Sequence, residues 1–165
     1  MSGYNVLDNA AHWDPVTREL ILDRVHNVPE IAFFTPEEAS VLRAFLDVAL
    51  AAEDDEPRIP VLEMVDARLA RGDGDGYRYD DMPEDGQTWR RFAAQLREDG
   101  FEALADKHAY VQQLHDSKSR AWSVVMRYAL TALYSHPWAW NEIGFGGPAY
   151  PRGYMRMSGR EPHER

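Results

Sequence analysis

The stretch FFTPEEASVLRAFLDVAL, residues 33–50, decides the fold class of this 165-residue chain. Thr35 is typical of a helix N-cap, Pro36 of the first helical position, and Glu38 of the reciprocal partner in a capping box. Apolar side chains then recur every three or four residues, as one face of an amphipathic helix requires. These are Val41, Leu42, Phe45, Leu46 and Ala49. We therefore predict a helix whose apolar face packs on a core.

The same helical pattern repeats on both sides of this stretch. Helices are predicted over residues 14–25 with Asp14 as cap and Pro15 first, from Pro60 to near Gly72, over 88–98 until Gly100, over 101–116, and over 119–134. The last is the most apolar of these and is expected to be central, with Trp122, Val125, Met126, Ala129, Leu130 and Leu133 on its apolar face. No segment alternates like a strand, so we predict an all-α bundle of five to six helices with a long irregular C-terminal tail.

Three consecutive segments are expected along the chain. Residues 1–34 form an N-terminal extension with a short helix, residues 35–135 the helical bundle, and residues 136–165 an irregular docking segment. The length suits one domain, and an apolar fraction of 44% favours a folded chain. There is no cysteine, which excludes disulfides, thiolate nucleophiles and cysteine-bound metal centres.

The charge of the chain bears on its partners and location. A net charge of −10 disfavours binding to nucleic acid or to anionic membranes, both of which attract clustered Lys and Arg. The first twenty residues lack a basic start and an apolar run, and the pair Arg90-Arg91 lies mid-chain without a hydrophobic region after it. No apolar run is long enough to span a bilayer. We expect a cytoplasmic protein without a signal peptide, an N-terminal twin-arginine signal or a membrane span.

An acidic loop resembles part of a calcium site. Asp73, Asp75 and Glu84 fall at positions one, three and twelve of an EF-hand loop. However, Tyr77 stands where the fifth position needs Asp or Asn, and Arg78 replaces the glycine of the sharp turn. A solvated loop between helices is the better interpretation.

Other candidate catalytic or metal-binding sets are also incomplete. His108 and His115 are seven residues apart, whereas metal-binding pairs on one helix are usually three or four apart. Ser135 and His136 are adjacent, a spacing that rarely gives the geometry of a nucleophile and its base. The glycine clusters at residues 72–76 and 144–147 do not follow a strand. We therefore predict no catalytic, cofactor-binding or metal-binding residues in this chain, and no enzymatic activity of its own.

The remaining unusual stretch is LYSHPWAWNEIGFGGPAYPRGYM, residues 133–155. Its prolines and glycines exclude a long helix or a central strand, yet it is rich in aromatics. These side chains either pack on the chain's own bundle or face outward to bind a partner, because aromatics and arginine are enriched at interfaces. Tyr134 and Trp138 are close enough to the central helix to pack on the bundle, and for the other residues both alternatives stay open. The candidate partner-interface residues are Tyr134, Pro137, Trp138, Trp140, Asn141, Glu142, Phe145, Pro148, Tyr150, Arg152 and Tyr154.

This stretch resembles the C-terminal motif of the gluconate 2-dehydrogenase subunit 3 family. The matching positions are Tyr134, Pro137, Glu142, Ile143, Gly144, Phe145, Gly147 and Pro148. Residues 33–50 and the sequence DDMP at 80–83 are also similar to the family, so that the resemblance covers roughly residues 33–154.

The resemblance implies an accessory role in sugar or alcohol oxidation. Family members are small helical subunits that associate with a large FAD-dependent dehydrogenase of the glucose–methanol–choline type, which carries the flavin. The resemblance thus implies a hetero-oligomer with FAD in the partner and no cofactor in this chain. Many members carry an N-terminal twin-arginine signal, which this chain lacks, so a role in export is not carried over. The alternative is a stand-alone helical binding or scaffold protein that forms homo-oligomers.

Overall fold

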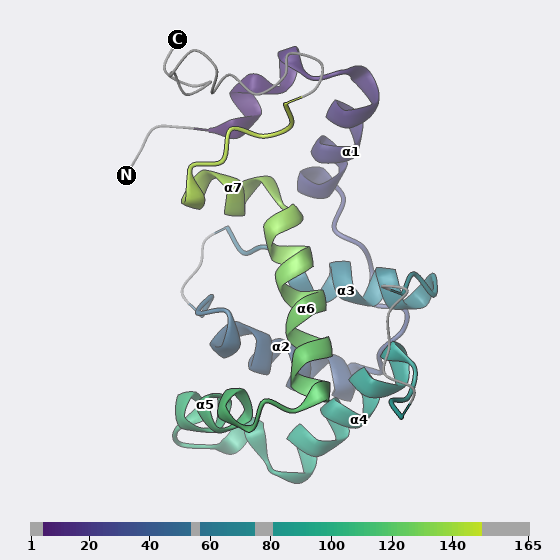
Figure 1. Ribbon diagram of the computed structural model, residues 1–165, viewed down its shortest axis with the longest axis vertical. Coiled ribbons are helices and arrows are strands. Elements are labelled where there is room, and N and C mark those ends of the chain that lie inside the picture. The colour runs from purple at the N-terminus through teal and green to yellow at the C-terminus, as the bar shows by residue number, and fades with distance from the viewer. Residues whose placement is uncertain (1–4, 54–56, 75–80, 150–165) are drawn as a thin grey trace. The chain divides into compact units, whose positions relative to one another are not determined.

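The computed structural model describes residues 5–53, 57–74 and 81–149 (Figure 1). Within these residues the chain is helical, with no strand, and the predicted all-α class is confirmed. The elements are η1 (Val6–His12), α1 (Pro15–His26), α2 (Pro36–Ala49), α3 (Val61–Ala70), α4 (Asp85–Glu98), η2 (Phe101–Ala103), α5 (Lys107–Ser117), α6 (Arg120–Ser135) and α7 (Pro137–Ile143).

The chain divides into two compact units. The central unit is Pro29–Ala132, and the terminal unit joins Met1–Val28 to Leu133–Arg165. The three consecutive segments expected from the sequence therefore differ from the observed division, because both ends of the chain contribute to one unit. Local sequence patterns carry no signal for such a pairing of distant segments.

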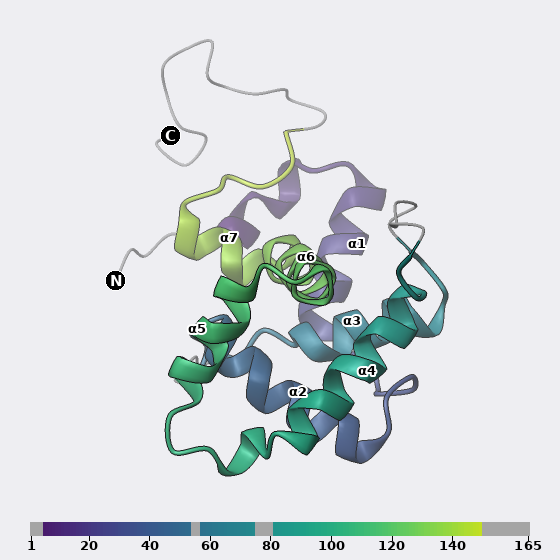
Figure 2. The same cartoon turned by 60° about the horizontal axis from the view of Figure 1, so that its bottom comes forward.

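Helix α2 organises the central unit and begins as predicted. The Thr35 hydroxyl accepts a hydrogen bond from the Glu38 amide at 3.2 Å, and the Glu38 carboxylate accepts one from the Thr35 amide at 2.9 Å. The predicted apolar face is buried from Val41 to Leu46. This face packs against α3, α4 and α5, which Figure 2 shows around α2.

Aromatic side chains fill the core of the central unit. The ring of Phe45 lies 5.0 Å from that of Phe92, 5.9 Å from that of Phe101 and 6.0 Å from that of Trp122, each in an edge-to-face arrangement. Such pairs are favourable beyond the area that they bury. Trp89, Phe92, Ala93 and Leu96 of α4 are buried, as the sequence predicts.

A buried carboxylate fixes the segment that leads into α2. Asp66 of α3 is completely buried and accepts hydrogen bonds from the amides of Ala32, Phe33 and Phe34, at distances of 2.7 to 3.1 Å. Hydrogen bonds to a charged acceptor are stronger than those between neutral groups. Asp66 therefore holds three consecutive amides, and with them the main chain that carries the Phe33 side chain.

Two details of the central unit differ from the sequence prediction. The helix predicted over 101–116 is interrupted: η2 ends at Ala103, Leu104 is extended, and Asp106 caps α5 by accepting from the Ala109 amide at 2.9 Å. In α6 the buried side includes Val125 and Ala129 as predicted, but Leu130 is 38% exposed. A helix with apolar residues on more than half of its circumference cannot bury all of them against neighbours on one side.

Candidate partner-binding segment

The motif at the C-terminal end contains a short helix. His136 caps α7, its Nδ1 atom accepting from the Trp138 amide at 3.3 Å, and Pro137 is the first helical residue. Gly144 ends the helix in the left-handed conformation, with φ of +67°. The predicted irregular conformation is thus wrong for residues 137–143, because proline favours a first helical position as much as it disrupts a later one. Residues 145–149 have no regular structure, as expected.

Trp140 lies in the core of the terminal unit. It is only 7% exposed and belongs to a buried cluster with Val6, Trp13 and Ile21. Its indole nitrogen donates to the main-chain oxygen of Tyr134 at 2.6 Å. Trp140 is therefore held by both its ring and its polar atom.

The segment after α7 lies against the N-terminal residues. The side-chain oxygen of Asn141 accepts from the Val6 amide at 2.8 Å, and the Asn9 amide group donates to the oxygen of Gly146 at 3.5 Å. Gly147 has φ of +83°, and a Cβ atom there would lie 2.8 Å from the Trp13 ring. Figures 1 and 2 both show the yellow segment alongside η1. Residues 141–147 of the motif thus pack on the N-terminal extension.

A buried histidine and an arginine join α1 to this segment. The Nε2 atom of His136 is 3.0 Å from the main-chain oxygen of Arg24, and the Arg24 guanidinium donates to the oxygen of Ser135 at 2.7 Å. Burial lowers the pKa of His136, and the charge of Arg24 adds to this effect; burial also lowers the pKa of Arg24. A neutral imidazole that donates from Nε2 and accepts at Nδ1 satisfies both of its contacts.

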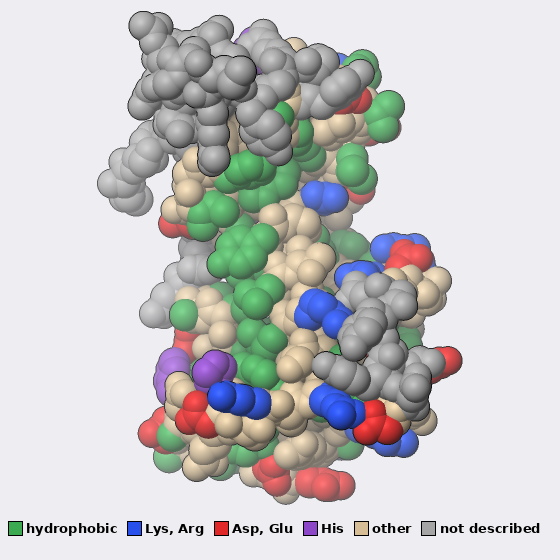
Figure 3. Space-filling model, viewed as in Figure 1, with side chains coloured by type: hydrophobic (Ala, Val, Ile, Leu, Met, Phe, Trp, Pro, Cys, Tyr) green, Lys and Arg blue, Asp and Glu red, His purple; other side chains and the backbone are tan. Residues whose placement is uncertain are grey.

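Three apolar side chains of the motif face outward. Tyr134 is 51% exposed, Ile143 59% and Phe145 40%. Figure 3 shows hydrophobic side chains, in green, at the surface of this region. The Phe145 ring meets the Trp140 ring edge to face at 5.4 Å, so the buried anchor supports an exposed neighbour. We call Tyr134, Ile143 and Phe145 the outward trio.

The predicted interface residues therefore separate into groups. Pro137 and Trp140 are buried and offer no surface to a partner, which corrects the prediction for these two. Asn141 is half-buried and bonded to Val6, Trp138 is half-buried with its ring 4.7 Å from that of His136, and Pro148 is half-buried. Tyr134, Glu142 and Phe145 are exposed. Tyr150, Arg152 and Tyr154 lie outside the described residues.

Five residues that hold this segment in place are not indicated for that role by the sequence. Four of them lie in the N-terminal extension, far away in the sequence. The residues are Val6, Trp13, Ile21, Arg24 and His136. The one available signal was Trp13, a large aromatic directly before the capped start of α1, where a side chain often packs back on its own helix.

The other candidate residues named from the sequence lie apart from this segment or have partners of their own. No group of three or more His, Cys, Asp or Glu side chains that could bind a metal ion is found among the residues that the structure describes. His108 pairs with Glu53 at 3.1 Å, and His115 lies 3.1 Å from Asp116. Asp75, Tyr77 and Arg78 of the EF-hand-like loop lie outside the described residues. Both ring nitrogens of His136 are occupied by main-chain groups.

Comparisons with known proteins give no relative for this chain: no family model, no curated protein and no solved structure matches it. In the described part of the chain, the helices are too short or too polar for any to cross a membrane.

Proposed function

We propose that this chain is a non-catalytic small subunit that binds and stabilises a large FAD-dependent sugar or alcohol dehydrogenase of the glucose–methanol–choline type. The proposal rests on the resemblance of residues 133–155 to the corresponding family motif. One structural observation carries it further: the motif holds itself in place through Trp140 and Asn141 while it exposes the outward trio.

This arrangement has the physical properties of a prepared interface. Aromatic and large apolar side chains concentrate in the cores of interfaces, and the outward trio supplies three of them within twelve residues of sequence. The main chain beneath them is fixed by hydrogen bonds and by the packing of Gly147 on Trp13. A segment that is already ordered loses little conformational freedom on binding, which favours affinity.

The chemistry of such a complex belongs to the partner. In this proposal the large subunit contains the FAD and the catalytic residues, and the small subunit contributes surface and stability in a cytoplasmic hetero-oligomer. The alternative is that the outward trio joins copies of this chain, as a stand-alone helical scaffold would require. The same surface serves both proposals, so the experiment must separate them.

Co-expression with a large oxidoreductase of this type from the same genome tests the proposal. We expect the two chains to co-elute in size-exclusion chromatography under a peak that absorbs at flavin wavelengths. The double variant Tyr134→Gln/Ile143→Gln changes two exposed side chains and should abolish co-elution. Val16→Gln, which changes a 75% exposed side chain of the same unit, is the matched control and should co-elute normally.

Two outcomes would overturn the proposal. Separate elution of the wild-type chain from a soluble and active oxidoreductase would rule out this partnership. A symmetric oligomer of the isolated chain that dissociates in the Tyr134→Gln/Ile143→Gln variant, and that ignores the oxidoreductase, would establish the scaffold alternative.

A further inference from the structure

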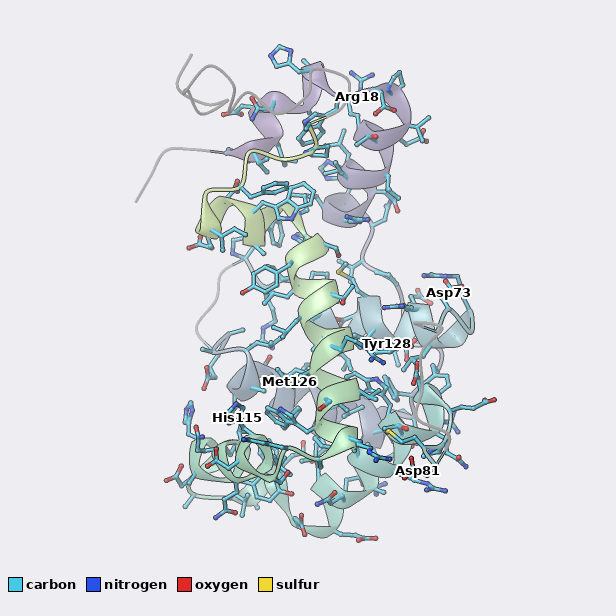
Figure 4. All side chains as sticks on the ribbon, in the orientation of Figure 1. Arg18, Asp73, Asp81, His115, Met126 and Tyr128 are labelled. Atoms are coloured by element: carbon cyan, nitrogen blue, oxygen red, sulfur yellow. The ribbon has the colours of Figure 1, made fainter. Side chains whose placement is uncertain are left out.

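The central unit contains a cavity of about 790 Å³ that the proposed function does not use. Its walls come from the segment before α2, the end of α3, the start of α4 and the middle of α6. In Figure 4 the Tyr128 side chain projects from α6 toward the side on which Asp73 lies, whereas Met126 lies on the other side of the helix. Cavities of 300–1,000 Å³ are typical of small-molecule sites.

The apolar part of the wall is held rigidly. Phe33 is fixed through its amide by Asp66, and a Cβ atom at Gly86 would lie 2.7 Å from the Phe33 ring. The Arg90 guanidinium covers the ring at 4.5 Å and donates to the Phe33 oxygen at 2.9 Å. The Phe33 wall is therefore supported both from α3 and from α4.

Three carboxylates line the cavity, and two of them have a hydrogen-bonded or ion-paired partner. Asp73 pairs with Arg71 at 2.8 Å, and Asp85 accepts from the Tyr128 hydroxyl at 2.6 Å. Glu84 and Asp85 stand at the N-terminus of α4, where the helix dipole stabilises negative charge. The negative charge of the wall is thus partly offset by Arg71, by Arg90 and by the start of α4, while carboxylate oxygens remain as hydrogen-bond acceptors.

The same wall carries hydrogen-bond donors. Arg90 has five N–H groups, and the described contacts use one of them. The exposed amide of Gln87, one position beyond Gly86, can both donate and accept. Donors and acceptors therefore both occur in the wall of this cavity, and its apolar surface comes mainly from the half-buried Phe33, since Leu69 and Tyr128 are almost completely buried.

This combination selects one class of ligand. An anion would meet three carboxylates, and a bare cation would meet the positive charge of Arg90 beside carboxylates of which two already have partners. A purely apolar ligand would strip water from the charged wall without replacing its hydrogen bonds. A hydroxyl group donates and accepts at once, and the C–H face of a polyol packs on an aromatic ring. We infer that this cavity binds a neutral polyhydroxylated molecule of the size of a monosaccharide or disaccharide.

The inference is tested on the full chain by saturation-transfer NMR with glucose and sucrose as probes. Glucosamine and glucuronate, the cationic and anionic counterparts of glucose, report on charge preference. We expect saturable signals from the neutral sugars and weaker signals from both charged analogues. Gln87→Leu removes hydrogen-bonding groups at nearly constant volume and should weaken neutral-sugar binding about tenfold. Gln95→Leu, at an exposed position two turns further along α4, is the matched control.

The outcomes separate clearly. Loss of affinity in Gln87→Leu but not in Gln95→Leu, with unchanged circular dichroism and melting temperature in both, supports the site. Tighter binding of glucosamine or glucuronate overturns the ligand class. Unsaturable signals from the neutral sugars, or equal affinities in both variants, overturn the site itself. None of these results depends on an oxidoreductase partner.

Discussion

The indole nitrogen of Trp140 lies 2.6 Å from the main-chain oxygen of Tyr134, six residues earlier in the chain. Tyr134 belongs to the last turn of α6, where carbonyl groups have no partner within the helix. The same side chain therefore fills the core of the terminal unit and satisfies the end of a helix. The exposed side chains of Tyr134 and Phe145 are next to this buried residue, and the Phe145 ring packs on it.

Trp140→Ala should lower the free energy of unfolding of the terminal unit by about 3–5 kcal/mol, because it leaves a cavity beside Trp13 and Ile21. Urea titration followed by near-ultraviolet circular dichroism measures the loss. Phe145→Ala, which removes a side chain that is 40% exposed, should cost only about 1 kcal/mol. Equal losses in the two variants would contradict the division into anchor and outward residues.

Gly147→Ala and Gly144→Ala form a matched pair within the same motif. Both glycines have positive φ, so alanine should cost about 1–2 kcal/mol of strain at either position. At Gly144 nothing lies within 4 Å of the added Cβ, whereas at Gly147 the Cβ would overlap the Trp13 ring. Gly147→Ala should therefore cost about 1–3 kcal/mol more, as overpacking does. Thermal unfolding of the two variants side by side checks the difference, and identical melting temperatures would refute the close packing on Trp13.

Asp66→Ala should destabilise the central unit by about 3 kcal/mol or more, because three amides in residues 32–34 lose a charged acceptor. Asp66→Asn keeps one acceptor oxygen and should cost clearly less. Denaturant titration gives both values. Amide hydrogen exchange adds a local test, since the amides of Phe33 and Phe34 should exchange faster in Asp66→Ala. Unchanged protection of these amides would show that Asp66 does not hold the segment.

The buried His136 should make stability depend on pH. Burial lowers its pKa in the folded state below the usual value of 6.5, so the unfolded state binds the proton more readily. The resulting stabilisation is complete above pH 6.5 and is lost as the pH falls below that value toward the folded-state pKa. The free energy of unfolding of the wild type should therefore decrease between pH 7.5 and pH 5.5.

His136→Gln should be less stable at pH 7.5 but should show a flatter dependence over the same range. His108→Gln replaces an exposed imidazole and is measured beside it as a control for the loss of a histidine as such. Urea titrations at several pH values supply the slopes. If His136→Gln and the wild type had the same slope, His136 would not be the responsible group.

Local chemistry made much of this fold predictable. The cap at Asp14 followed by Pro15, the capping box of Thr35 and Glu38, and the stop at Gly100 each occupy a few adjacent residues. Such signals act within one turn of helix, so a single sequence contains them completely. The apolar faces of α2 and α4 were visible for the same reason.

The candidate site was harder to predict because it depends on distant residues. The close contact of Gly147 with Trp13 cannot be predicted from the residues around Gly147 or from those around Trp13. Pro137 was interpreted as a helix breaker, although it is the first residue of α7. Trp140 and Phe145 are aromatics of similar sequence context, yet the first is buried and the second is exposed. Only the packing of the folded chain distinguishes them.

The hydrogen bond from Val6 to Asn141 spans 135 positions and has a consequence for biosynthesis. A ribosome releases the N-terminal segment before its packing partners have been translated, whereas Pro29–Ala132 is continuous and can fold as it emerges. Closure of the terminal unit is then a late event, governed by a contact of high sequence separation. A nascent chain that stops before α7 leaves Trp13 and Ile21 uncovered, and exposed apolar residues of this kind are what chaperones and proteases recognise. Burial of Trp13 thus distinguishes a chain that has been translated past α7 from one that stops before it.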